Sequence, residues 1–173
     1  MGSETADLGE YDYIIVGAGS AGSLLAVLRA CLVSGFRPLT LTSLTVSGGV
    51  ATCTYTGGHG YMDGVMIDVA GATPSGLNGR KKIIVTGAGT FTFAAPGVSD
   101  GAVAGTITTK RSPLGWAELN SGNVSIFSRT EVGAAAQGLR IDDSAAGLAG
   151  TTYARAVGVE AWTDVNTYSG LFP

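Results

Sequence analysis

The chain has 173 residues, of which 28 are glycine and only 13% are charged, and its net charge is −3. This length fits one domain, or one small domain with appended segments. The short basic run Arg80–Lys82 is too small to indicate a nucleic-acid surface, and no apolar run reaches the roughly 18 residues of a membrane span. Met1–Tyr13 is acidic where a signal peptide needs a basic segment. The mean hydropathy of +0.32 favours a chain that covers part of its surface in an assembly.

The N-terminus combines an acidic stretch with a glycine motif. Its first ten residues are MGSETADLGE, and we expect a flexible acidic and glycine-rich arm over residues 1–22. Within the arm, YDYIIVGAGSAG predicts a strand that runs into Gly17, Gly19 and Gly22. In a dinucleotide-binding fold such glycines allow a tight turn and let a pyrophosphate approach a helix N-terminus. The string resembles the start of the glucose-methanol-choline family of FAD oxidoreductases, which implies a parallel βαβ unit.

A working dinucleotide motif needs more than its glycines. It needs a second parallel strand that ends in Asp or Glu about 20 residues on, to bind the ribose hydroxyls. The chain has no acidic residue between Asp12 and Asp63, and strand and helix patterns do not alternate afterwards. We therefore expect no cofactor and no cofactor-binding residues. The alternative is an FAD- or dinucleotide-binding oxidoreductase fragment that uses residues 17–22.

The next segment predicts one helix. Ser23–Val33 places four leucines on one helical face, and Ser34-Gly35 followed by Pro38 predicts where the helix stops. The leucines are Leu24, Leu25, Leu28 and Leu32. We expect residues 23–39 to form an amphipathic helix and a linker, with the helix packed on the β module of residues 40–109.

Residues 40–109 predict a small antiparallel β-barrel or sandwich. Short β-branched or aromatic runs alternate there with glycine turns. The runs are Leu44–Val46, Val50–Tyr55, Val65–Val69, Ile83–Thr86, Thr90–Phe93 and Gly105–Thr109. Two hairpins are expected, one around Gly48-Gly49 and one that joins Ile83–Thr86 to Thr90–Phe93.

Residues 110–173 predict a second β-rich region. Its strand candidates are Val124–Arg129, Gly138–Asp142 and Tyr153–Glu160, with small-residue loops at Glu131–Gln137 and Asp143–Gly150. Tyr153, Arg155, Val157 and Val159 fall on one face of a period-two strand. Trp116 and Trp162 fill gaps between layers or lie at a subunit contact, and the sequence does not choose between these uses.

Few residues suggest chemistry. His59 has no cluster of metal ligands near it in sequence, and we expect it to be structural or solvent-exposed. Cys31 and Cys53 have no disulfide or metal spacing, so both are expected to be buried free thiols. Asp142, Asp143 and Asp164 do not match a calcium-loop pattern. We predict no catalytic, cofactor-binding or metal-binding residues, and no enzyme.

The order of motifs over Ala21–Pro173 carries a second resemblance. The motifs are Gly58-His-Gly-Tyr61, Asp63-Gly-Val65, Val69-Ala-Gly-Ala-Thr-Pro74, Leu77-Asn-Gly79 and Thr90-Phe-Thr-Phe93, with Ala21–Phe36 before them and Pro113–Trp116, Arg140–Ser144 and a closing Phe-Pro after them. This series resembles small β-barrel modules of tailed-bacteriophage virion proteins, a type that is labelled after the FCCH domain of the ubiquitin-activating enzyme.

That resemblance implies a scaffold without catalysis. We expect a structural component of a tailed phage particle, in the tail, the neck or the capsid, that is located in the virion. Its implied partners are other virion proteins and copies of itself, with no nucleic acid and no membrane. A host-surface binding module is the third alternative.

Overall fold

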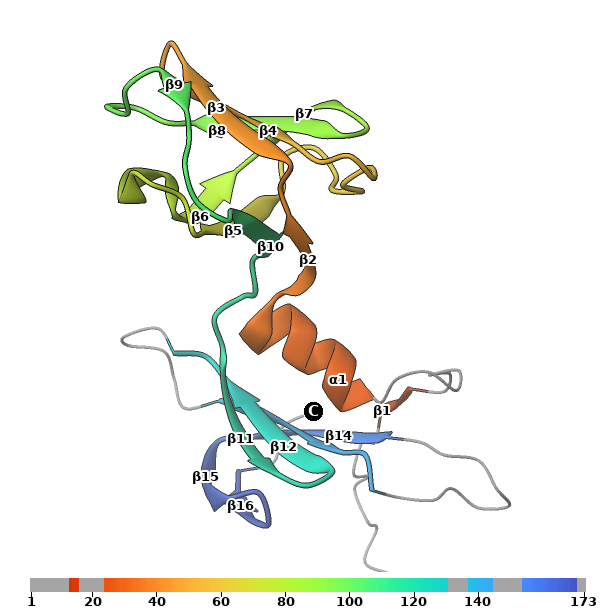
Figure 1. Cartoon of the computed structure of the whole chain (residues 1–173). Helices are drawn as coiled ribbons and strands as arrows, with labels where there is room; N and C mark the ends of the chain where they lie inside the picture. Colours follow the sequence, from red (N-terminus) through yellow and green to blue (C-terminus); the bar gives the residue numbers. More distant parts are fainter. Residues whose placement is uncertain (1–12, 16–23, 131–136, 145–153, 171–173) are drawn as a thin grey trace, which may run out of the picture. The chain divides into compact units, whose positions relative to one another are not determined.

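The computed structural model describes residues 13–15, 24–130, 137–144 and 154–170 (Figure 1). These residues are mainly β, in antiparallel sheets with one short helical segment, which confirms the predicted fold class. The chain forms two compact units: a central unit of residues 34–113, and a split unit of residues 1–33 and 114–173. Among the described helices, none is long and apolar enough to cross a membrane.

The central unit consists of two antiparallel sheets. Its strands are β2 (Phe36–Thr40), β3 (Ser43–Ser47), β4 (Val50–Thr54), β5 (Met66–Ala70), β6 (Gly79–Lys82), β7 (Ile84–Gly87), β8 (Thr90–Ala94), β9 (Gly101–Ala102) and β10 (Thr108–Arg111). One sheet has the order β7-β8-β4-β3-β9 and the other β2-β10-β5-β6. A 3₁₀ turn, η2 (Ser75–Leu77), lies between β5 and β6.

Alternating side chains build the core of the central unit. Successive residues of a strand point to opposite faces, so every second residue turns inward. On β3, Leu44 and Val46 are buried and their neighbours are exposed, and on β8 the buried pair is Phe91 and Phe93. These side chains share one core with buried residues of β4, β5 and the connecting segments.

Both predicted hairpins form. β3 pairs with β4 through a turn at Gly48 and Gly49, whose φ angles are +58° and +76°. Two consecutive left-handed residues make the turn whose twist matches that of the strands, and glycine adopts this conformation without strain. β7 pairs with β8 as the second hairpin.

Two strands differ from the sequence-based expectation. β2 occupies part of the segment predicted as a linker; it lies at a sheet edge, where Pro38 does not interrupt a central ladder. The strand predicted at Gly105–Thr109 is displaced to β10. Gly105 has a φ of +113°, and a Cβ there would lie 2.0 Å from the carbonyl oxygen of Gly71. This close backbone approach keeps Gly105 out of the strand.

The split unit consists of a five-stranded sheet, a helical segment and a hairpin. Its strands are β1 (Tyr13–Ile15), β11 (Ala117–Ser121), β12 (Val124–Ser128), β13 (Gly138–Asp142), β14 (Ala154–Val159), β15 (Ala161–Asp164) and β16 (Thr167–Ser169). The sheet order is β1-β14-β13-β12-β11, and β15 pairs with β16. The predicted helix is present as α1 (Leu24–Arg29), continued by a π-helical turn, η1 (Ala30–Ser34).

Each face of the split unit's sheet has its own cover. On one face, Phe127 and Ile141 pack with Leu25 and Leu32 of the helical segment. The prediction that the helix packs on the β module of residues 40–109 is therefore wrong, because its buried leucines share a core with β12 and β13. On the other face, Ile126 and Val159 pack with Val165 from the turn of the β15–β16 hairpin. Because the two cores use alternate residues of the same strands, neither face of the sheet is left without apolar contacts.

The strand before the glycine motif is not part of a parallel sheet. β1 lies at the sheet edge and pairs antiparallel with β14. The dinucleotide-binding alternative predicts a parallel βαβ unit at this position, so its expectation for β1 is wrong. Gly17, Gly19 and Gly22 lie outside the described residues.

Neighbouring isoleucines provide a matched test of the core. Ile83 is fully buried, whereas Ile84 is 62% exposed. We expect Ile83→Ala to lower the free energy of unfolding by about 2–5 kcal/mol, because it removes buried methyl groups and leaves a cavity. Ile84→Ala should change it by less than about 0.5 kcal/mol. Urea denaturation measures both, and equal losses would contradict the inward and outward assignment of this segment.

Candidate functional site

The only histidine of the chain is buried and fully hydrogen-bonded. His59 is 1% exposed. Its Nδ1 accepts a hydrogen bond from the backbone N–H of Tyr61 at 2.9 Å, and its Nε2 lies 2.9 Å from the carbonyl oxygen of Gly87. Since a carbonyl can only accept, Nε2 carries the hydrogen and Nδ1 is the acceptor. His59 thus ties its own loop to the end of β7, which fulfils the expectation of a structural histidine.

Aromatic rings surround the imidazole. The ring centroids of His59, Tyr61 and Phe91 lie 5.1–5.6 Å apart, with Phe91 edge-on to both of the others. The Tyr61 hydroxyl donates to the carbonyl of Arg37 at 3.2 Å and lies 3.0 Å from the hydroxyl of Thr109. Burial raises the pKa of Tyr61, so this hydroxyl keeps its proton near neutral pH. The cluster connects the loop to strands of both sheets.

Arg37 on β2 also holds this loop. Its Nε donates to the carbonyl of His59 at 2.8 Å, and its own backbone φ is +55°, unusual for a residue with a side chain. A Cβ on Gly60 would lie within 2.5 Å of the Arg37 guanidinium, so the guanidinium approach requires glycine there. We call the set Arg37, His59, Gly60, Tyr61 and Thr109 the histidine latch. Sequence analysis singled out His59 but missed Arg37 and Thr109, which lie far away along the chain.

The two cysteines differ in environment. Cys53 on β4 is buried, and burial raises the pKa of its thiol to about 12. Cys31 is exposed on the helical segment, so the prediction that both thiols are buried is wrong for Cys31. Leu25 and Leu32 supply the buried face of that segment, and Cys31 lies on another face.

A carboxylate joins the helical segment to the split unit's sheet. The two oxygens of Glu118 accept from Nε and Nη2 of Arg29 at 2.7 and 2.5 Å, and one also accepts from the Ser125 hydroxyl. The hydrogen bonds from Arg29 lower the pKa of Glu118, and the one from Ser125 contributes to the same shift. This geometry, a bidentate arginine on a carboxylate, is a structural clamp.

Two of the three acidic residues considered for a metal, Asp142 and Asp164, have other partners. Asp142 accepts hydrogen bonds from Ser144 and lies 3.4 Å from Nη2 of Arg140. Burial alone would raise the pKa of Asp142, but the bonds from Ser144 and the charge of Arg140 outweigh it and lower that pKa. Asp164 accepts from two backbone N–H groups in the β15–β16 turn. Within the described ranges, no three acidic, cysteine or histidine side chains converge as a metal site would require.

Both tryptophans lie between layers of the split unit. Trp116 packs with the core between the helical segment and the sheet, and Trp162 with the core between the hairpin and the sheet. Each is half-buried. Both side chains therefore fill gaps between layers, which is one of the two uses that the sequence left open.

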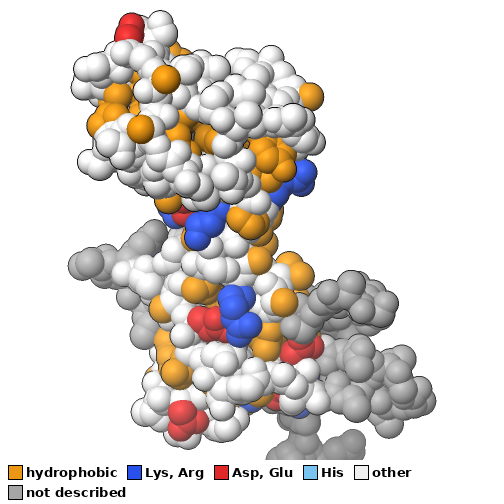
Figure 2. All heavy atoms as spheres, viewed as in Figure 1, with side chains coloured by type: hydrophobic (Ala, Val, Ile, Leu, Met, Phe, Trp, Pro, Cys, Tyr) orange, Lys and Arg blue, Asp and Glu red, His pale blue; other side chains and the backbone are white. Residues whose placement is uncertain are grey.

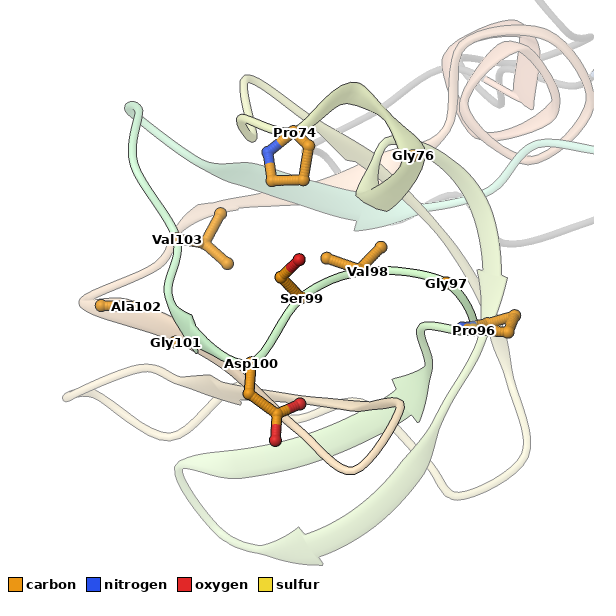
Figure 3. Close-up of a pocket in the computed structure, with 10 residues that line it drawn as sticks. All are labelled: Pro74, Gly76, Pro96, Gly97, Val98, Ser99, Asp100, Gly101, Ala102 and Val103. Carbon is orange, nitrogen blue, oxygen red and sulfur yellow. The ribbon is translucent and has the colours of Figure 1, made fainter.

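The central unit also has a recess of about 580 Å³, which is lined by Pro74, Gly76 and the segment from Pro96 to Val103. Figure 3 shows Pro74, Val98 and Val103 directed toward the recess and the Asp100 carboxylate directed away from it. That carboxylate accepts from the N–H of Gly48 in the β3–β4 turn at 2.9 Å. Ser99 is left as the polar side chain at the recess, so its described lining directs no charged side chain into it.

Comparisons of the chain with protein-family models, with characterised proteins and with solved structures find no match.

Thiol reactivity tests the environments of the cysteines. We expect Ellman's reagent to modify one thiol per folded chain and two after denaturation, because the thiolate is the reactive form and Cys53 is buried with a raised pKa. Cys31→Ser should abolish the reaction of the folded protein, and Cys53→Ser should leave it unchanged. Rapid modification of Cys53 in the folded chain would contradict the assigned burial.

Proposed function

We propose that this protein is a structural component of a tailed phage particle, in the tail, the neck or the capsid, and acts through subunit contacts without catalysis. The resemblance of Ala21–Pro173 to β-barrel modules of virion proteins suggests this role. The β-rich architecture of both units is compatible with it.

The histidine latch is the observation that carries the proposal. A general base needs a ring nitrogen that can reach a substrate proton. Both ring nitrogens of His59 instead bond to backbone groups of the same unit. The loop that carries the chain's single histidine is therefore used to hold the fold together, as a scaffold protein requires.

The surface provides groups for contacts between subunits. Large apolar side chains are exposed on both units; they include Phe36, Met62, Met66 and Ile84 on the central unit and Val27, Leu114 and Leu119 on the split unit. Figure 2 shows such side chains at several places on the visible face. Ile84 lies on β7, an edge strand, and edge strands present unpaired backbone groups to a neighbouring chain. Repeated copies turn weak contacts of this kind into stable assemblies.

Two measurements test this function. Peptide mass spectrometry of purified phage particles from the source of this gene should detect the chain as a constituent of the virion. Native mass spectrometry of the purified full chain should give multiples of its 17.3 kDa mass without a bound cofactor.

The glycine motif supplies the control. Gly17→Ala with Gly22→Val should leave the oligomers seen by native mass spectrometry unchanged, apart from the mass of the substituted side chains. Absence of the chain from particles would overturn the proposal. An added mass of one FAD per chain that this double variant abolishes would instead establish the oxidoreductase alternative.

A further inference from the structure

The basic residues of the central unit all lie on one of its two sheets. Residues 34–113 contain six Lys or Arg and three Asp or Glu, so this unit has a net charge of +3. The six are Arg37 on β2, Arg80, Lys81 and Lys82 on β6, and Lys110 and Arg111 on β10. Figure 2 shows Lys and Arg side chains at the end of this unit where Figure 1 places β2 and β10, and none on the visible part of the end that carries β3 and β9.

Cross-strand register brings three of these cations to the same face. Asp68 on β5 lies directly opposite Arg80 on one side and Lys110 on the other. Residues that lie directly opposite share a face, and Lys82 lies two residues beyond Arg80 on the same face. We call Arg80, Lys82 and Lys110 the basic face. One carboxylate, that of Asp68, stands among its three positive charges.

Most of this positive charge has no carboxylate partner in the unit. Nζ of Lys110 donates to the carbonyl of Ser34 at 2.6 Å, and Nζ of Lys81 donates to the carbonyl of Gly76 at 3.0 Å. Carbonyl groups satisfy these donors but leave their charge in place. Within the part of the chain that the structure describes, Arg80 alone of the six has a carboxylate oxygen within 4.0 Å, that of Asp68 at 3.8 Å. The basic face is therefore suited to an acidic ligand.

The chain itself contains a complementary segment. Residues 1–33 and 114–173 contain four Lys or Arg and ten Asp or Glu, a net charge of −6. Four of the acids lie in residues 1–12, at Glu4, Asp7, Glu10 and Asp12, and the first basic residue of the chain is Arg29. No twelve-residue window that begins after Glu4 contains as many acids without a Lys or Arg.

We propose that the basic face of the central unit binds the acidic segment 1–12 of a second copy of the chain. This inference rests on the proposed function, which requires subunit contacts, and it names one of them. The two partners are different surfaces, so the contact is head-to-tail and repeats from copy to copy. Charge complementarity of this kind fixes which surfaces meet and in what orientation.

Sedimentation velocity of the full chain tests the proposal at low and high salt. We expect oligomers in about 0.05 M NaCl that dissociate by about 0.5 M, because salt screens contacts between exposed charges. Arg80→Gln with Lys82→Gln should weaken association at least tenfold. Glu4→Gln with Asp7→Asn, which removes charge from the acidic segment, should weaken association to the same extent. The charge-swapped protein, which combines R80E and K82E with E4K and D7K, should associate again.

A control with the same change of net charge separates this contact from a general charge effect. Ser43→Glu with Thr45→Glu also lowers the net charge by two, but at exposed positions of the opposite sheet, and it should leave association unchanged. If the Arg80 variant fails to fold by circular dichroism, Lys82→Gln with Lys110→Gln replaces it.

If neither set of variants changes the association of the chain, the inference is overturned. The proposed function would remain in place, since it depends on the presence of the chain in virions. A chain that stays monomeric in low salt would also overturn it. Binding of a DNA duplex that the basic-face variants abolish, without any effect on association, would assign the face to nucleic acid instead.

Discussion

The fold of the central unit depends on a buried imidazole that has no unused hydrogen-bonding atom. His59 bonds to Tyr61 and Gly87 through its two ring nitrogens, and its carbonyl accepts from Arg37. Loss of one such partner leaves a buried polar group unpaired, at a cost of about 1–3 kcal/mol. These bonds connect a glycine-rich loop to β2 in one sheet and β7 in the other. They explain how a short loop with few apolar side chains keeps one conformation.

In the central unit, the groups that stabilise the interior are largely different from the charged groups. Interior contacts of the central unit are apolar or hydrogen-bonded within the unit, and all six of its cations lie on strands of one sheet. The remainder of the chain has the opposite net charge. Apolar burial thus holds each unit together, whereas the proposed contact between copies would depend on charge.

The sequence predicted the local features well and the long-range ones poorly. Gly48-Gly49 specifies its hairpin through backbone conformation alone, and the leucine spacing of Ser23–Val33 specifies a helix with one apolar face. β10 could not be placed in this way, because its start depends on the approach of Gly105 to Gly71. The partner of the His59 ring at Gly87 lies 28 residues away, and the basic face appears only when β6 and β10 are assembled around β5. Such features require strand order, which residue patterns do not encode.

The hydrogen-bonded state of His59 tests the central claim most directly. Long-range ¹H–¹⁵N NMR of the full chain in mildly alkaline buffer reports which ring nitrogen carries hydrogen and how fast that hydrogen exchanges with solvent. The account predicts the Nε2–H tautomer, with a hydrogen protected by its bond to Gly87. An Nδ1–H tautomer, or a ring hydrogen that exchanges as fast as in a free peptide, would show that the imidazole is available for other chemistry and that the latch does not hold the loop.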